Sequence, residues 1–197
     1  LDDCGNASSA MAAGFGTAAG ASFDIGNGFT GAIGYEGQGS DQVGLMTKEG
    51  TDSYGGQLSY AADQYGASVT YNITETSSTE ETTYWGLNGY WTPSETGSMP
   101  SISVGYETGD PSAASAKDTE HYFIGLQWDE VGPGTLGVAA GTADPVEENA
   151  SELMMYEAFY SYPVNDGLTI TPIVFIEEKA AGTDDLTGVA VKASFSF

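Results

Sequence analysis

The sequence predicts an all-β fold, a transmembrane antiparallel meander β-barrel, and three observations lead to this prediction. Apolar and polar residues alternate with a period of two along most of the chain. The alternating segments are long, and short turns and longer acidic loops join them in turn. The chain also ends on a strict alternation, VAVKASFSF, with Phe197 as its last residue. A strand of this kind has a different environment on each of its two faces.

About eleven such segments can be recognised, each longer than the ~5–6 residues of a common soluble strand. Their length is close to the ~9–11 residues with which a tilted strand crosses a bilayer. They lie at residues 18–24, 29–36, 53–62, 65–74, 82–92, 100–107, 120–129, 134–142, 152–162, 167–177 and 186–197. We therefore expect a meander of long hairpins over residues 17–197. No run of 18 apolar residues offers a helical membrane span.

The connections between these segments fall into two classes. Tight turns occupy 25–27, 62–64, 92–100, 130–134 and 163–167, and the intervening connections are longer. Five windows around the longer connections (36–52, 73–83, 107–120, 142–152 and 177–186) hold 19 of the 28 acidic residues. Short turns at one end and long polar loops at the other are typical of a bacterial outer-membrane barrel.

The composition narrows the classes of function. The chain has 28 acidic residues, four Lys and no Arg, which gives a net charge of −24 at pH 7. Nucleic-acid and phosphate binding need clustered Lys and Arg, so nucleic acid is excluded as a partner. The 12 Tyr, 8 Phe and 3 Trp argue against a disordered acidic chain. The single cysteine, Cys4, excludes an internal disulfide framework.

The two faces of the expected strands predict different surroundings. The apolar faces carry Tyr, Trp and Phe near the strand ends, which predicts two aromatic girdles at the membrane–water interfaces. The expected girdle residues include Trp85, Trp91, Trp128, Tyr162 and Phe197. The opposite faces are rich in Gly, Ser, Thr, Asn and Gln, with a few ionisable groups. Because a charge facing lipid costs ~2–4 kcal/mol at the midplane, we expect these groups to line a water-filled lumen. They are Glu107, His121, Glu157, Glu177 and Lys192.

No motif for catalysis or cofactor binding emerges. Gly26, Gly28 and Gly31 match G-x-G-x-x-G, but the match lies in a predicted hairpin with no following helix. His121 is the one histidine, and no partnering motif for a hydrolase accompanies it. Metal binding has one His, one Cys and dispersed carboxylates to draw on, and no D-x-D-x-D-G spacing occurs. We therefore expect no enzyme activity, no cofactor and no metal site.

The hairpins and the terminal aromatic carry a resemblance to a known family. GFTGAIGYEG, GLQWDEVGPGTLGVAAG, YEAFYSYPVNDGLTITPIVFIEE and DDLTGVAVKASFSF resemble the C-terminal barrel of cyanobacterial outer-membrane porins of the carbohydrate-selective porin family, some of the iron-uptake type. The resemblance runs from about residue 17 to Phe197 and is strongest over the final 75 residues. It implies a 16-stranded, usually trimeric barrel that passes small solutes or inorganic ions. It also implies that assembly machinery recognises the terminal Phe197.

The chain departs from that family because about eleven strands are visible and no N-terminal anchoring domain is present. We expect a piece of a larger porin, in which residues 1–16 are the tail of the loop that folds into the pore in general porins. Lumen carboxylates without opposing Arg predict a cation preference. The alternative is a secreted acidic β-rich adhesin or structural surface protein, in which the same alternation would bury one face in a sandwich.

Overall fold

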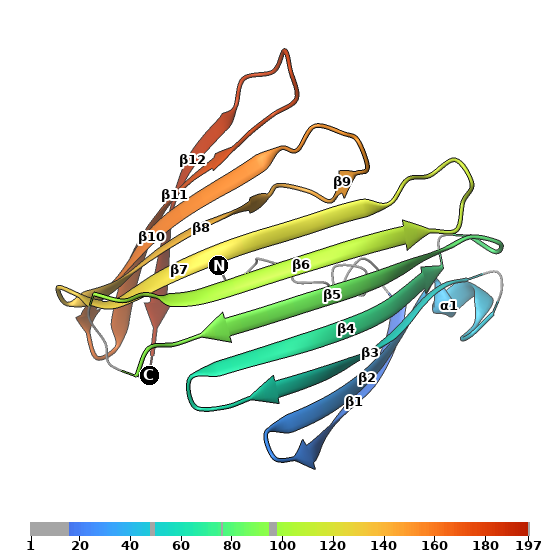
Figure 1. The fold of residues 1–197 in the computed structure, drawn as a ribbon, viewed down its shortest axis with the longest axis horizontal. Coiled ribbons are helices and arrows are strands. Elements are labelled where there is room, and N and C mark those ends of the chain that lie inside the picture. Colours follow the sequence, from blue (N-terminus) through green and yellow to red (C-terminus); the bar gives the residue numbers. More distant parts are fainter. Residues whose placement is uncertain (1–15, 48–49, 76, 95–97, 197) are drawn as a thin grey trace.

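The computed structural model describes residues 16–47, 50–75, 77–94 and 98–196, and in them the chain forms one curved antiparallel sheet (Figure 1). The sheet has 12 strands, and eleven of them follow one another in chain order as neighbours. The strands are β1 (Gly16–Gly26), β2 (Phe29–Gln38), β3 (Thr51–Ala61), β4 (Tyr65–Glu75), β5 (Glu81–Trp91), β6 (Ser101–Pro111), β7 (Thr119–Val131), β8 (Gly134–Thr142), β9 (Val146–Glu147), β10 (Met154–Asn165), β11 (Leu168–Glu177) and β12 (Leu186–Phe195).

The predicted all-β meander is confirmed. Each of the eleven segments expected from the alternation corresponds to a long strand of 9–13 residues. Within the described residues the sheet path begins at β1 and ends at β12, and these two strands are not paired with each other. The sheet is therefore an open, barrel-like wall rather than a closed cylinder.

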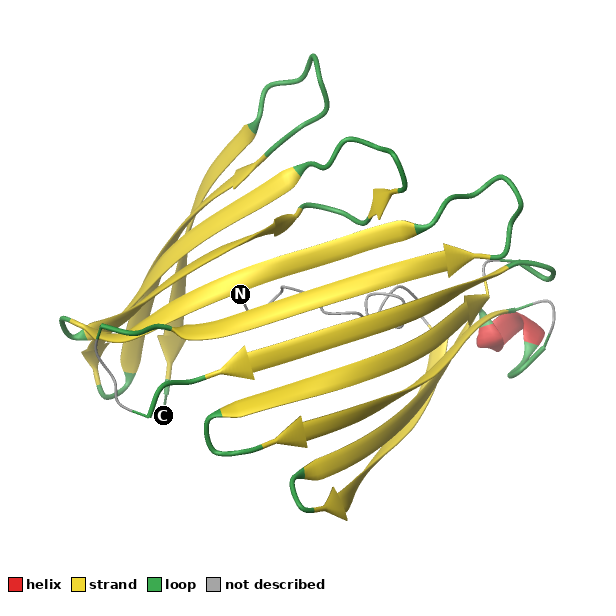
Figure 2. Cartoon of the chain, in the orientation of Figure 1, coloured by secondary structure: helices red, strands yellow, loops and turns green. Residues whose placement is uncertain are grey.

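Two short elements lie outside the meander of long strands. The helix α1 (Ser40–Val43) is a single turn in the connection between β2 and β3 (Figure 2). Strand β9 lies in the connection between β8 and β10 and pairs with Thr119 and Glu120 at the start of β7. It thereby extends the β7–β8 hairpin. Both elements are too short to leave a periodic pattern in the sequence.

The two classes of connection lie at opposite ends of the sheet, because successive strands run antiparallel (Figure 1). One of the two-residue turns joins β1 and β2 through Asn27 and Gly28, whose φ angles are 55° and 84°. Positive φ at both central residues is the geometry of a type I′ hairpin turn, which suits the twist of the flanking strands. The longer acidic connections gather at the other end, where the chain needs no tight reversal.

Candidate pore wall

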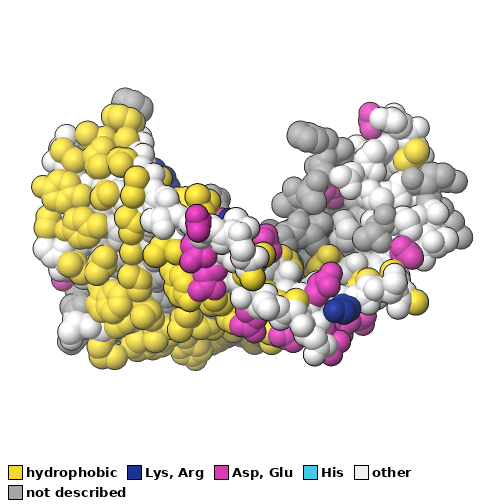
Figure 3. All heavy atoms as spheres, turned by 90° about the horizontal axis from the view of Figure 1, so that it is seen from above, with side chains coloured by type: hydrophobic (Ala, Val, Ile, Leu, Met, Phe, Trp, Pro, Cys, Tyr) yellow, Lys and Arg dark blue, Asp and Glu magenta, His cyan; other side chains and the backbone are white. Residues whose placement is uncertain are grey.

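The two faces of the sheet differ in polarity and in exposure. On β4, Gly66, Thr70 and Asn72 are buried, whereas Tyr65 and Tyr71, which alternate with them, are exposed. Side chains on the concave face of a curved sheet crowd one another, so the polar face is the concave one. Hydrophobic side chains cover a broad area outside the hollow (Figure 3). This is the reverse of a soluble domain, which buries its apolar face.

The predicted lumen residues Glu107 and His121 lie opposite each other on the concave face. They are direct cross-strand partners between β6 and β7, and Glu107 is also opposite Gly86 of β5. The Glu107 side chain is only 4% exposed. The Nδ1 atom of His121 lies 2.7 Å from Oγ1 of Thr142, so a hydrogen bond joins the ring to the end of β8. These residues form one polar cluster on the wall.

The other three predicted lumen residues lie on the same face but further along the sheet. Glu157 on β10 is opposite Phe175 of β11, and Lys192 on β12 is opposite Thr171. Glu177 ends β11 and forms an ion pair with Lys179. The five predicted residues therefore share a face but do not form one compact site.

Glu36 is an ionisable group of this face that was absent from the predicted set, as were Asp24 on β1 and Asp129 on β7. Glu36 on β2 pairs with Ser53 of β3 and is 8% exposed. Its position could have been found from the alternation of Tyr35 and Ile33 on the opposite face. Glu36, Glu107, Glu157 and Glu177 all lie in the half of their strands nearer the long connections. Lys192 lies in the half of β12 nearer the short turns.

The predicted girdle residues that the structure describes lie on the apolar face. Trp85 is opposite Tyr71, with ring centroids 4.7 Å apart, and Trp91 is opposite Tyr65. Trp128 is opposite Leu136, and its indole N–H donates a hydrogen bond to the Ser98 carbonyl. Tyr162 is opposite Ile170 and is exposed. Phe197 lies outside the described residues.

Tyrosine hydroxyls near the long connections donate hydrogen bonds to carboxylates. The bonds run from Tyr35 to Asp52 (3.0 Å), from Tyr54 to Glu75 (3.2 Å) and from Tyr122 to Glu152 (2.7 Å). Each ring thus remains on the apolar face while its polar tip reaches a charged group. This division is what the interface between hydrocarbon and water favours.

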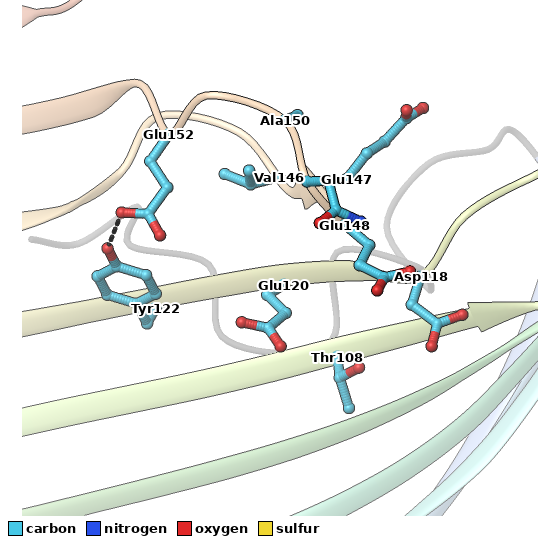
Figure 4. A pocket seen from close by; sticks show the side chains of 10 residues that line it. Thr108, Asp118, Glu120, Tyr122, Val146, Glu147, Glu148, Ala150 and Glu152 are labelled. Carbon is cyan, nitrogen blue, oxygen red and sulfur yellow. Dashed lines mark hydrogen bonds between the residues drawn. The ribbon is translucent and has the colours of Figure 1, made fainter.

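The Tyr122–Glu152 bond closes one side of a pocket of about 320 Å³ at the long-loop end of β7 (Figure 4). Its carboxylates are those of Asp118, Glu120, Glu147, Glu148 and Glu152. Across the part of the chain that the structure describes, no group of three or more His, Cys, Asp or Glu side chains is arranged to hold a metal ion. In the same residues, no helix is long and apolar enough to cross a bilayer.

Comparison with known proteins decides the family. Residues 4–171 match the Gram-negative porin family, which is well over half of the 197 residues. The chain belongs to the Gram-negative porins. No curated protein matches the chain.

A solved porin has the same fold. The chain is similar to the anion-selective porin from Comamonas acidovorans, with a TM-score of 0.65 and 13% sequence identity. The similarity covers 91% of this chain and 55% of that one, so this porin chain spans about half the length of its structural neighbour. At this identity the likeness shows the fold alone. For a porin, an apolar convex face and a polar concave face mean lipid outside and water inside.

Proposed function

We propose that the protein is a passive diffusion channel of the bacterial outer membrane, and that its concave face lines the channel. Membership of the Gram-negative porin family supports this proposal. The single observation that carries it is the reversal of polarity, with exposed apolar residues on the convex face and buried polar groups such as Asn72 and Glu107 on the concave face. The bilayer is then the solvent of one face, and small solutes and ions are the occupants of the other.

We further propose that this part of the channel prefers cations. Glu36, Glu107, Glu157 and Glu177 lie on the concave face, and Lys192 is the one basic residue that the described strands place there. Clustered carboxylates raise the local concentration of cations in a confined aqueous space. The anion selectivity in the name of the Comamonas porin is a property of that protein, from which this chain differs at most positions.

Reconstitution of the complete protein in planar bilayers tests both statements. Under a KCl gradient, we expect discrete conductance steps and a reversal potential of the sign that K⁺ selectivity produces. A reversal potential of the opposite sign would refute the cation preference and leave the channel. Absence of any conductance from correctly folded protein would refute the channel itself.

Several finer features belong to the same proposal. Among the described residues, no strand pairs with the outer edges of β1 and β12, which suits a barrel that further strands complete, in line with the expected 16-stranded homotrimer. The cyanobacterial origin, the carbohydrate-selective and iron-uptake subtype and recognition of Phe197 by the assembly machinery are predictions from the sequence pattern. So are the absence of enzyme activity and the loop role of residues 1–16, of which 1–15 lie outside the described residues.

The alternative of a secreted adhesin or surface-layer protein is not favoured, because the family is one of porins. An adhesin would need a second layer against the apolar face, whereas Val189, Val191 and Phe195 are 80%, 70% and 63% exposed. Extraction separates the two functions. We expect the protein to leave the membrane fraction only with detergent, whereas an adhesin domain would stay in solution without it.

A further inference from the structure

The concave wall carries an apolar patch around one carboxylate. Glu157 lies opposite Ala139 of β8 and opposite Phe175 of β11. The neighbouring residues of β10 on the same face are Met155 and Phe159. Ala139 and Phe175, directly opposite Glu157, have their Cβ atoms about 4.5–5.5 Å from its own. Apolar residues therefore occupy both cross-strand positions beside Glu157 and both neighbouring positions of this face on β10.

Two of these neighbours are aromatic rings that lie along the wall. A Cβ atom added at Gly137 would collide with the ring of Phe159, and one added at Gly188 would collide with the ring of Phe175. Each ring therefore lies over the backbone of its cross-strand glycine. Both Phe side chains are only partly buried, so part of each ring remains accessible from the hollow.

The other acidic positions of this face have different neighbours. Glu36 has Gly34 beside it on β2 and Ser53 opposite it on β3. Glu107 has Gly86 and His121 opposite it, and its neighbour of the same face on β6 is Gly105, which the ring of Phe123 covers. A wall that only needs to contact water can be made of Gly, Ser and Thr. These three residue types make up most of this face on β3 and β4. Glu157 differs from both because one phenylalanine is its direct cross-strand partner and another is its neighbour on β10, which suits a ligand that uses both the charge and the apolar surface.

We propose that Glu157, Phe159 and Phe175 form a binding site for organic cations in which an ammonium group adjoins an apolar or aromatic body. The inference deepens the proposed channel function and rests on the concave face being its aqueous wall. The carboxylate attracts the ammonium group, and an aromatic face binds a cation by its quadrupole. The carboxylate also attracts an inorganic cation, but such a cation has no apolar body that could pack against the rings.

Other charged groups near the patch modify this affinity. Glu177 is opposite Met155 and already contacts Lys179. Lys192 is opposite Thr171, two concave-face positions along β11 from Phe175. An ammonium at this position opposes a cationic ligand, so the site is expected to bind the ligand more tightly when Lys192 is neutralised.

Block of the K⁺ current through the complete reconstituted porin measures the affinity. The probes are benzyltrimethylammonium and tetramethylammonium, which carry the same charge and differ in the aromatic body, with benzoate as an anionic control. We expect benzyltrimethylammonium to half-block the current at a concentration roughly fivefold or more below that of tetramethylammonium. Benzoate should not block.

Three variants test the assignment of residues. Glu157→Gln should raise the half-blocking concentration of both cations, and Phe175→Leu should raise that of benzyltrimethylammonium by the larger factor, because this probe alone carries an aromatic body. Phe159→Leu should have the same effect as Phe175→Leu, and it replaces Phe175→Leu in the test if that variant fails to assemble. Glu36→Gln is the matched control, because it removes a carboxylate of the same wall that has no ring beside it. It should leave the ratio of the two half-blocking concentrations unchanged.

Equal block by the two cations in the wild-type protein would overturn the inference, as would a ratio unaffected by Phe175→Leu and Phe159→Leu. Such a result would leave the channel and its K⁺ preference standing, because the reversal potential measures them separately. Conversely, an anion-preferring channel that benzyltrimethylammonium still blocks through Glu157 would refute the proposed selectivity and support this site.

Discussion

The ring of Phe175 on β11 lies over Gly188, the residue directly opposite it on β12. The same relation recurs on the concave face between Phe159 and Gly137 and between Phe123 and Gly105. In each case the missing Cβ of the glycine leaves the space that the ring fills. The rings therefore cover the backbone at the glycines, and the glycines allow the rings to lie close to the wall. Designed sheets use the same arrangement where an aromatic ring rescues an edge glycine.

The first prediction is that Gly188→Ala destabilises the barrel. The new methyl group would collide with the Phe175 ring, which must then leave its position. Because the clash is with the far end of a half-buried side chain, the cost lies at the low end of the range for overpacking, about 1 kcal/mol. The free energy of unfolding, from urea titration of the protein in detergent micelles followed by tryptophan fluorescence, should fall by that amount.

Gly89→Ala is the matched control for this substitution. A Cβ at Gly89 would meet its nearest neighbours, the Gly66 carbonyl oxygen and the Val104 side chain, at 3.6 and 3.7 Å. These are ordinary contacts, so the control should change stability much less. Equal losses for the two variants would show that strand propensity, and not the ring, sets the cost.

The second prediction concerns the charges on the wall. Glu107→Gln removes a carboxylate that is 4% exposed and lies opposite His121, and it should lower the K⁺ over Cl⁻ preference of the channel. Lys192→Gln removes the opposing charge and should raise that preference. The reversal potential under a KCl gradient measures both, and a Ser59→Ala variant, which alters a neutral residue of the same face, is the control. Shifts of the same sign in the two charge variants would contradict a wall whose charges act on the permeating ion.

The third prediction is that Tyr122→Phe loosens the connection at 143–153. The variant keeps the ring on the apolar face but loses the 2.7 Å hydrogen bond to Glu152 (Figure 4). Loss of one such bond should raise the rate of proteolytic cleavage in this connection by roughly two- to tenfold, because cleavage follows local opening. Tyr156 lies on β10, on the same apolar face of the sheet, and the Tyr156→Phe variant should be cleaved at the wild-type rate. Equal rates for Tyr122→Phe and the wild type would show that the bond does not hold the loop.

The long strands could be predicted from the sequence because each face has a uniform solvent over 9–13 residues. The alternation in YGASVTYNI therefore gave both the strand and the side on which Tyr65 and Asn72 lie. Glu36 was left out of the predicted lumen residues although it ends the predicted segment 29–36 and its parity places it on the wall. The rings over glycine could not be predicted, because they depend on cross-strand register, and no single strand encodes the residue opposite each position.

The last prediction concerns the end of the chain. Phe195 is 63% exposed and lies on the convex face with Val189 and Val191, so the final strand presents an apolar stripe to the membrane. The resemblance to outer-membrane barrels implies that the terminal aromatic is recognised during assembly. Deletion of Phe197 should therefore lower the amount of protein in purified outer membranes several-fold, as measured by immunoblot. Deletion of Ala181 removes one residue from the connection at 178–185 and should leave that amount near the wild-type level. Equal amounts from the two deletions would show that the terminal ring has no part in assembly.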